Sequence, residues 1–386
     1  MEVFLHVVDW VLWILVVPSV MYVTFYAIVS LFHRKPKLYS ATNIPQFSFL
    51  VLFPAYHEDR VIIDSVKRCL EQTYPKELYD IGVISDHMEE TTNDQLRELP
   101  IILYTPHFEK SSKAKAMQYA ISSTLKEYDK VVILDADNIV APDFLEQLNI
   151  VCQQDHHAIQ CHRCAKNKNN DIAALDGVSE EINNTIFRKA HNTIGLSSAL
   201  IGSGMCFDFK WFSDNVHYLS TAGEDRELEA LLLKQNIFIK YAEHIHVFDE
   251  KVSNSDNFQR QRLRWMTAQI QSLLSMLPYI PQAIQTCNIN YIDKTFQQVI
   301  IPRSISIVAI FTVAIFILII HPTWSLKWWT IFVILIISLI IATPSKLRTI
   351  SIFSKPVLLC NLTFKMICNI IHIEKDNKDF LHTNHG

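Results

Sequence analysis

The sequence predicts an α/β domain built on a mostly parallel sheet, with transmembrane α-helices on both sides of it along the chain. Short apolar runs alternate with stretches of helical periodicity between residues 45 and 268, which is typical of strands connected by helices. Long apolar runs lie before and after this region, and 49% of the 386 residues are hydrophobic. That fraction is high for a soluble protein of this length, so membrane-spanning segments are expected.

The first apolar run covers residues 10–32 and is long enough to cross a bilayer. It lacks the basic front and the small-residue cleavage site of a signal peptide, so we interpret residues 1–34 as an N-terminal transmembrane anchor. A basic cluster follows at residues 33–37, and basic residues collect on the cytoplasmic side of a span. The N-terminus is therefore expected outside and the next domain in the cytoplasm.

Two further apolar runs, residues 301–320 and 328–343, predict a transmembrane helical hairpin over residues 301–345. Residues 321–327 are expected to form the connection between its two helices. Two spans return the chain to the cytoplasm, where the positive-inside rule favours basic residues. The basic residues after the hairpin fit that side, namely Lys346, Arg348, Lys355 and Lys365.

Other apolar stretches are shorter or mixed with polar residues. Residues 269–300 are expected to form interfacial helices, with prolines interrupting the stretch 273–284. Residues 346–386 are expected to form an amphipathic, juxtamembrane cytoplasmic tail. For residues 355–373 within it, a third C-terminal span is the alternative.

The polar middle of the chain, residues 35–268, predicts the α/β domain itself. Strands are expected at residues 47–53, 81–85, 101–104 and 131–134, and helices at residues 61–72 and 113–125. In parallel sheets of this kind, ligands bind beyond the carboxyl ends of the strands. The residues that follow each strand are therefore the candidates for function.

Charge and cysteine content narrow the class of protein. The net charge of −4 carries no basic bias, so nucleic acid is not expected as a partner. The 8 cysteines show no repeated spacing, which argues against a disulfide framework and favours a reducing, cytoplasmic setting.

The most informative local pattern is Asp135-Ala136-Asp137 at the end of an apolar run. Residues i and i+2 of an extended chain project to the same side, so the two carboxylates are expected to lie together. Two such carboxylates repel unless a cation lies between them, and hard oxygen ligands suit Mg²⁺ or Mn²⁺, which bridge phosphate oxygens. The alternative is that Asp137 only caps the following turn.

Two other motifs follow predicted strands. Glu58 lies in the segment 53–58, and Asp86 follows Ser85 at the end of the next strand. Asp86 is placed to bind a ribose hydroxyl or the edge of a base. Taken alone, each motif is better explained by an ordinary strand-to-helix turn.

An acidic segment at residues 222–227 contains Glu224 and Asp225 beside a glycine. Asp225 is a candidate general base. The alternative is a helix N-terminus, where acidic residues are favoured by the helix dipole.

The segment 259–265 combines glutamine, arginine and tryptophan. Gln261 and Arg264 are suited to bind a diphosphate, and arginine binds such groups in a bidentate manner. Trp265 offers an apolar face to a sugar ring. The alternative is a basic juxtamembrane stripe beside anionic lipids.

Taken together and in this order, these motifs resemble those of glycosyltransferase family 2, in particular its membrane-embedded branch of cellulose, chitin, hyaluronan and poly-N-acetylglucosamine synthases. The resemblance covers residues 45–270. It rests on the motifs containing Ala55 and Glu58, Asp86, Lys113, Asp135-Ala136-Asp137, Gly202-Ser203-Gly204-Met205, Gly223-Glu224-Asp225 and Gln261-Arg262-Leu263-Arg264-Trp265. In this family two acids commonly stand where this chain has Ser85 and Asp86, so only Asp86 remains.

The resemblance implies a GT-A fold and a role for each matching position. The nucleotide-sugar donor would contact Ala55, Glu58, Asp86, Lys113, Asp135, Gln261 and Arg264. Mg²⁺ or Mn²⁺ would bind Asp137 and Asp135, with Asp137 as the more direct ligand. The acceptor would contact Gly202, Ser203, Gly204, Met205, Glu224 and Trp265, and Asp225 would deprotonate its hydroxyl.

The expected activity is inverting transfer from a UDP-sugar to a growing β-linked polysaccharide at the cytoplasmic face of a bacterial inner membrane. Expected partners are a nucleotide-sugar donor, a glycan or lipid-linked acceptor, the lipid bilayer, and a homo-oligomer or accessory export subunit. One alternative is single addition onto a lipid-linked or short glycan acceptor. Another is an inactive carbohydrate-binding scaffold. The scaffold is disfavoured by the presence of Asp135, Asp137, Asp225 and Arg264.

Histidines and cysteines gather between residues 152 and 164. Their spacing fits no common structural zinc pattern, so a zinc site is not favoured. His244 and His246 would share a face of an extended strand and are interpreted as core or surface residues.

Overall fold

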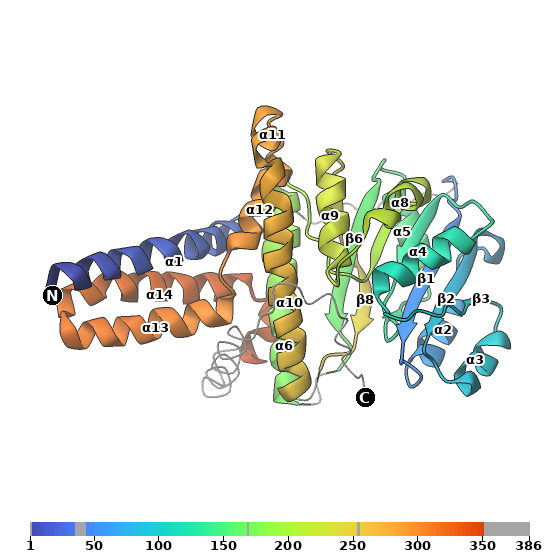
Figure 1. Cartoon of the computed structure of the whole chain (residues 1–386), viewed down its shortest axis with the longest axis horizontal. Helices are drawn as coiled ribbons and strands as arrows, with labels where there is room; N and C mark the ends of the chain where they lie inside the picture. Colours follow the sequence, from blue (N-terminus) through green and yellow to red (C-terminus); the bar gives the residue numbers. More distant parts are fainter. Residues whose placement is uncertain (1, 35–43, 168–169, 253–254, 351–386) are drawn as a thin grey trace.

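The computed structural model describes residues 2–34, 44–167, 170–252 and 255–350, and it has the α/β architecture expected from the sequence (Figure 1). Its eight-stranded sheet has the order β3-β2-β1-β4-β7-β6-β8-β5. The strands are β1 Phe49–Tyr56, β2 Tyr79–Asp86, β3 Ile102–Tyr104, β4 Lys130–Ile133, β5 Ile139–Val140, β6 Ala158–Ala165, β7 Met205–Asp208 and β8 Ile239–Asp249.

The half of the sheet formed by β3, β2, β1 and β4 is parallel. Strand β1 pairs in parallel with β2 and β4, while β7 runs antiparallel between β4 and β6. Residues 49–53 of β1 have no exposed surface, which explains why this strand is an unbroken apolar run rather than an alternating one. Tyr56 pairs with Asp86, so β1 and β2 end at the same edge. The motifs that follow them are therefore brought together.

Helices cover both faces of the sheet. One core contains residues of α2 Ile62–Leu70, α3 Glu90–Arg97 and α5 Phe144–Cys152, with η1 Lys76–Leu78 beside it. The other contains residues of α4 Lys113–Ser123, α8 Phe209–Asn215, η3 Val216–Tyr218 and α9 Glu224–Lys234, together with η4 Leu277–Tyr279, α11 Ile280–Gln285 and α12 Ile289–Val299.

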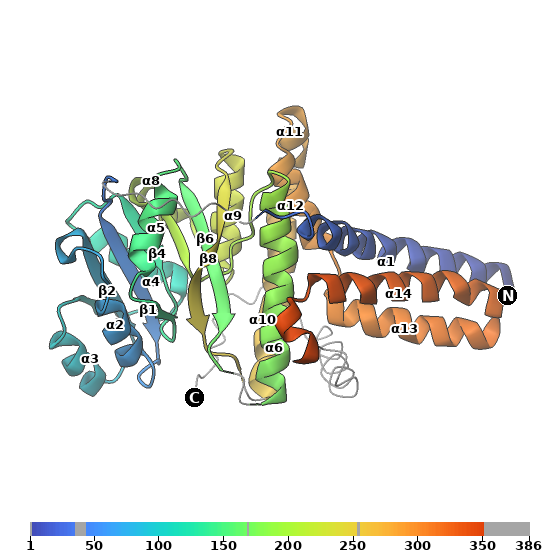
Figure 2. The ribbon, with the colours of Figure 1, turned by 180° about the vertical axis from the view of Figure 1, so that it is seen from behind.

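Two long helical segments separate the sheet from the apolar helices (Figures 1 and 2). One is α6 Asp171–Asn183, which continues through the π-helical segment Asn184–Ala190 into α7 His191–Thr193. The other is α10 Ser255–Met276. The expected boundary between residues 268 and 269 falls inside α10.

Three helices are long and apolar enough to cross a membrane: α1 Glu2–Ser30, α13 Arg303–Ile320 and α14 Pro322–Ala342. They pack side by side and extend away from the sheet (Figure 2). The expected connection over residues 321–327 is wrong, because α14 already begins at Pro322. Proline is favoured in the first turn of a helix, where its missing N–H costs no hydrogen bond. Helix α14 is followed by η5 Ser345–Ile350.

Helix α1 also begins earlier than the expected span and so includes a buried acid. The carboxylate of Asp9 accepts a hydrogen bond from Trp328 Nε1 at 2.7 Å and lies 2.5 Å from Lys327 Nζ. Both partners belong to α14. Asp9 and Lys327 therefore neutralise each other and join α1 to α14.

The C-terminal half of α1 is joined to the rest of the protein by a polar cluster. Tyr22 Oη lies 2.9 Å from His191 Nε2, and Tyr26 Oη donates to Asp293 at 2.7 Å. The rings of Tyr26 and His191 stack at 3.8 Å between centroids. These contacts hold α1 against α7 and α12.

Some expectations lie outside the described residues. These are the basic residues 35 and 37, the stretch 355–373, and almost all of the tail predicted at 346–386.

Candidate functional site

A cavity of about 460 Å³ lies between the strand ends of the sheet and the helices α6, α9 and α10. It also reaches the first residues of α13. Nearly all of the residues expected to bind donor, metal or acceptor line it, namely Ala55, Glu58, Asp86, Lys113, Asp135, Asp137, Gly202, Glu224, Asp225, Gln261, Arg264 and Trp265. Residues from motifs far apart in the sequence thus share one space.

The carboxyl ends of β1 and β2 form one end of the cavity. Asp86 is buried, and one of its carboxylate oxygens lies 2.6 Å from His87 Nδ1. His57 and His87 each follow a strand and have positive φ angles of 53° and 55°. Non-glycine residues rarely adopt this conformation, and such strain gathers at functional sites. Both turns direct the chain away from the strand ends.

Lys113 connects three segments of the cavity. It is the first residue of α4, whose N-terminus is capped by the Ser112 hydroxyl accepting from Lys115 N at 3.2 Å. Lys113 Nζ donates to Asp135 and, at 2.6 Å, to the carbonyl of Gly202. It also lies 3.6 Å from Glu224. Burial would lower the pKa of Lys113, but Asp135 and Glu224 raise it, so the side chain stays charged.

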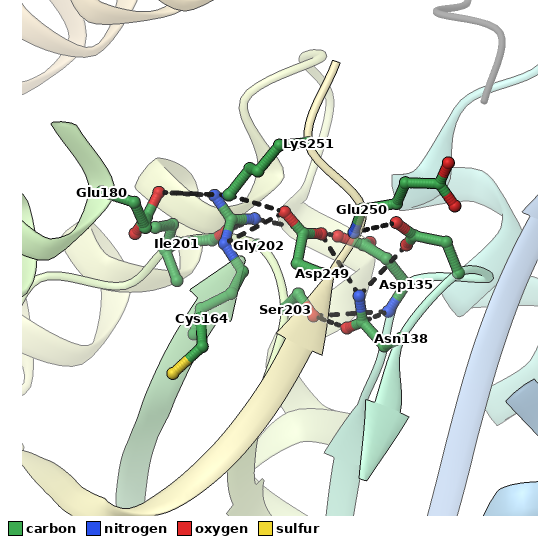
Figure 3. Close-up of polar contacts among 12 residues, drawn as sticks. Asp135, Asn138, Cys164, Glu180, Ile201, Gly202, Ser203, Asp249, Glu250 and Lys251 are labelled. Carbon is green, nitrogen blue, oxygen red and sulfur yellow. Dashed lines mark hydrogen bonds and ion pairs between the residues drawn. The ribbon is translucent and has the colours of Figure 1, made fainter. Parts of the chain in front are cut away.

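The loop that carries the two aspartates is held by Asn138, which sequence reasoning had not singled out. Its side-chain oxygen accepts from Asp135 N at 3.0 Å and from the Ser203 hydroxyl. Its amide group donates to Asp137 at 3.1 Å and to Asp249 at 3.3 Å (Figure 3). Asn138 is fully buried, so these bonds fix the loop conformation.

The two aspartates differ in their surroundings. Asp137 is buried and accepts from Glu250 N at 2.8 Å, whereas the side chain of Asp135 is 32% exposed and pairs with Lys113. Each carboxylate has lone pairs beyond these bonds. Two carboxylates that line one cavity from one short loop are a donor set that fits Mg²⁺ or Mn²⁺.

Arg163 was not predicted, although it lies at the centre of the charged groups behind this loop. It projects from β6, with Nη2 at 3.1 Å from Glu180, Nε at 3.9 Å from Asp249 and Nη1 at 4.0 Å from Asp135. An arginine within a strand of the sheet is the signal that could have identified it, because an arginine that becomes buried there needs acidic partners.

Glu180 on α6 completes this cluster. It is buried and lies 3.5 Å from Arg188 Nη1 and 3.8 Å from Lys251 Nζ, as well as near Arg163. Burial alone would raise the pKa of Glu180, but the three cations together lower it to about 2. Lys251 also donates to Asp249 at 2.8 Å (Figure 3). The sheet, α6 and the π-helical segment are therefore linked by alternating charges.

Two acids lie in the first turn of α9. Glu224 is buried, and this burial raises its pKa to about 7, although Lys113 opposes the shift. Asp225 is more accessible, and its Oδ2 would lie 3.8 Å from a Cβ atom built at Gly202. Gly202 has a φ of +79°, which glycine adopts without strain. The bare backbone at Gly202 thus leaves room in front of both acids.

Helix α10 places Gln261, Arg264 and Trp265 on the cavity, as expected from the sequence. Arg262 lies between them and pairs with Asp176 of α6. Its guanidinium carbon is 4.5 Å from the centroid of the Trp265 ring. One face of the Trp265 ring is therefore covered by Arg262, and only the rest of the ring is left for other contacts.

Ser203, Gly204 and Met205 do not line the cavity, in contrast to the expectation that they contact the acceptor. All three are buried, and Met205 begins β7. Gly204 N donates to Ile133 O at 2.9 Å, which joins this segment to β4. These residues lie beneath Gly202. They do not reach the cavity because this segment is bonded to the neighbouring strand β4 of the sheet.

The histidines and cysteines between residues 152 and 164 are divided by the fold. Cys152 and Cys161 are buried in the core, and His157 pairs with Asp208. His162, Cys164 and His246 gather with ligand atoms within 4.8 Å of one another. However, His162 Nδ1 lies 2.7 Å from Tyr241 Oη and Nε2 lies 3.0 Å from Glu181, so both ring nitrogens already have partners.

The fold and the cavity together define an α/β domain with a charged site at its strand ends, attached to apolar helices. A family model described as glycosyl transferase family group 2 matches residues 130–343, which is more than half of the chain. The chain therefore belongs to glycosyltransferase family 2, and it is a glycosyltransferase. No curated protein matches it in sequence.

Solved structures support the fold. The mannosyltransferase PcManGT from Pyrobaculum calidifontis, in complex with GDP-Man and Mn²⁺, superposes with a TM-score of 0.54 at 15% identity, over 84% of this chain and 93% of that one. TarS from S. aureus gives a TM-score of 0.45 at 13% identity, over 85% and 90% of the two chains. Glucosyl-3-phosphoglycerate synthase from Mycobacterium tuberculosis gives 0.41 at 14% identity, over 59% and 79%. The first of these supports the GT-A fold.

Proposed function

We propose that this protein transfers a sugar from a UDP-sugar to a growing glycan, with inversion at the anomeric carbon and with a divalent metal ion. The proposal places it in the membrane-embedded branch of the family that makes β-linked polysaccharides. The cytoplasmic face of a bacterial inner membrane is its proposed location. The observation that carries it is the cavity shared by Lys113, Asp135, Asp225 and Arg264.

The donor is proposed to bind at the strand ends. Ala55, Glu58 and Asp86 line the part of the cavity at the carboxyl ends of β1 and β2, where parallel sheets bind nucleotides. Asp137 and Asp135 would hold Mg²⁺ or Mn²⁺, which neutralises charge on the diphosphate when bound. Lys113, Gln261 and Arg264 approach the same space from α4 and α10 and supply donors for phosphate oxygens.

The chemical step follows from the acids of α9. Asp225 accepts the proton of the acceptor hydroxyl, whose oxygen forms a bond to the anomeric carbon while the bond to the nucleoside diphosphate breaks. Arg264 stabilises the charge that develops on the leaving diphosphate. A single displacement inverts the anomeric carbon, so an α-linked donor yields a β-linked product. Glu224 and Trp265 are proposed to orient the acceptor.

The product must also leave the membrane face. Three spans in the described part of the chain make a narrow route for a polymer. We therefore expect a second copy of the chain or an accessory export subunit to complete an exit path.

Activity of the purified full-length protein in nanodiscs tests the proposal. UDP-sugars and GDP-sugars are screened for nucleoside diphosphate release with Mg²⁺ or Mn²⁺, with Asp225→Asn and Asp137→Ala as variants. Asp214→Asn is the matched control, because Asp214 lies on α8 with a side chain that is 61% exposed. Turnover with one donor, lost with EDTA and reduced ~10²-fold or more in Asp225→Asn, is expected. If the folded protein releases no nucleoside diphosphate from any donor, the alternative of an inactive carbohydrate-binding scaffold is favoured.

A further inference from the structure

The cavity continues beyond the proposed acceptor residues to the ends of the apolar helices that lie nearest the sheet. There its lining changes from charged groups to Ile182, Phe187, Ile300, Ile307 and Leu339. Ile307 and Leu339 belong to α13 and α14, two of the helices apolar enough to cross a membrane. One end of the cavity therefore meets the sugar chemistry, and the other meets the region where lipid is expected.

Arg303, the first residue of α13, lies at this junction and lines the cavity. Its Nη2 donates to Asn183 Oδ1 at 2.8 Å and to the carbonyl and hydroxyl of Ser179, each at 3.2 Å. Its Nη1 is buried and has no hydrogen-bond partner in the described part of the chain. The guanidinium is thus held in place on one side and unsatisfied on the other.

The neighbouring cations differ from Arg303 because each has an acid. Arg262 pairs with Asp176, Arg188 lies 3.5 Å from Glu180, and Lys294 lies 3.2 Å from Glu229. Among the described residues, no carboxylate lies within 4.0 Å of Arg303. A buried guanidinium nitrogen without a hydrogen-bond partner is costly, and an anion that reaches it from the cavity would remove that cost.

We propose that Arg303 binds the phosphate of a lipid-linked acceptor, whose lipid chain lies along α13 and α14 and whose sugar reaches toward Asp225. This rests on the proposed function and specifies its acceptor as a phosphorylated lipid that carries the glycan. A planar guanidinium matches phosphate oxygens in a way that an ammonium does not. The apolar walls of the cavity select an amphiphile over a free sugar phosphate.

The test uses the full-length protein in phosphatidylcholine nanodiscs, with the donor identified by slow nucleoside diphosphate release without acceptor. Polyprenyl-phosphate glucose is the charged acceptor, and octyl β-glucoside is the acceptor that has the sugar but no phosphate. Arg303→Gln is expected to raise the KM for the charged acceptor about tenfold or more. Arg303→Gln should leave basal nucleotide release and the KM for octyl β-glucoside unchanged. Arg303→Lys should lie between the wild type and Arg303→Gln.

Arg68→Gln is the matched control, because Arg68 is an exposed arginine of α2. An equal loss with both acceptors, or an unchanged KM for the charged one, would overturn the assignment. If Arg303→Gln does not fold, Arg303→Lys and native mass spectrometry of the wild type with the charged acceptor replace it. Phosphatidylglycerol at equal concentration should not compete, and full competition would mean a general anionic-lipid site. Absence of nucleotide release with any donor would count against the proposed function instead.

Discussion

Lys113 donates a hydrogen bond to the carboxylate of Asp135, the more exposed acid of the Asp135-Ala136-Asp137 motif. The same ammonium group binds the carbonyl of Gly202 and lies 3.6 Å from Glu224. One cation therefore fixes the relative positions of α4, the aspartate loop, the Gly202 turn and α9. Lys113 therefore sets the position of the proposed donor-binding residues relative to the proposed acceptor-binding residues.

Lys113→Ala should lower kcat/KM for the donor by roughly 10- to 100-fold, the range expected when one charge-assisted hydrogen bond is lost. Lys113→Arg should recover part of this loss because it restores the charge. Lys126→Ala is the control, since Lys126 pairs with Asp80 at a surface site. Steady-state release of nucleoside diphosphate measures the effect. Equal activity of Lys113→Ala and Lys126→Ala would contradict the role of Lys113.

Asn138→Asp should reduce both stability and activity, although it preserves the size of the side chain. The aspartate cannot donate to Asp137 or Asp249, and it adds a third carboxylate beside them. Each buried group left unsatisfied costs about 1–3 kcal/mol. A fall in the thermal unfolding midpoint in detergent is therefore expected. Asn138→Ala should be the milder change, because it adds no charge, and the reverse order would contradict this account.

The sequence predicted the residues at the strand ends better than the charged cluster around Arg163, because the signals of the strand ends are local. Asp86 ends β2 and Asp135 follows β4, and parallel pairing alone brings such residues to one edge. Arg163 lies near the carboxyl end of β6, and Asp249 is the last residue of β8. These strands are far apart in the sequence, and only their pairing brings the two residues together. No residue spacing in the sequence predicts that contact.

The ends of helices were also hard to predict where they depend on contacts between distant parts of the chain. Residues 321–327 carry polar and basic side chains, so the sequence favours a connection there. In the structure, Lys327 pairs with Asp9 of α1, and this tertiary contact makes a charged residue compatible with helix α14. Pro322 at the helix start was the local signal that favoured the longer helix.

The stability contributed by Glu224 should depend on pH. Its pKa is about 7 in the folded protein because it is buried, against an ordinary value of 4.5. The unfolded chain loses this proton at lower pH than the folded protein, so the folded protein loses stability as pH rises from 4.5 to 7. The full loss, on the order of 3 kcal/mol, is present above pH 7.

Glu224→Gln has no ionisable group at this position, so it should not lose stability as the pH rises. The variant therefore tests the direction of the predicted pH dependence. Its unfolding midpoint relative to wild type should be higher at pH 8 than at pH 5. Thermal unfolding in detergent at the two pH values, with Asp214→Asn as the control, measures the difference. A difference between variant and wild type that does not change with pH would show that burial does not raise this pKa.

Glu180→Gln should be among the most destabilising single changes in the protein. It leaves Arg163, Arg188 and Lys251 without their shared buried acid, and breaking a buried ion pair from one side costs about 3–5 kcal/mol. Because its pKa is lowered to about 2, the stabilisation from Glu180 is present at neutral pH and is lost only between about pH 4.5 and 2.

A double-mutant cycle with Arg163→Met separates this pair from the rest of the cluster. If Glu180 stabilises the fold chiefly through Arg163, the double variant should be less destabilised than the sum of the two single variants, because the arginine that Glu180→Gln leaves unpaired is gone. Chemical unfolding of the detergent-solubilised protein at pH 7 gives the three free-energy differences. Strict additivity would mean that Arg188 and Lys251 carry the interaction, and the cluster would then hold α6 to the π-helical segment rather than to the aspartate loop.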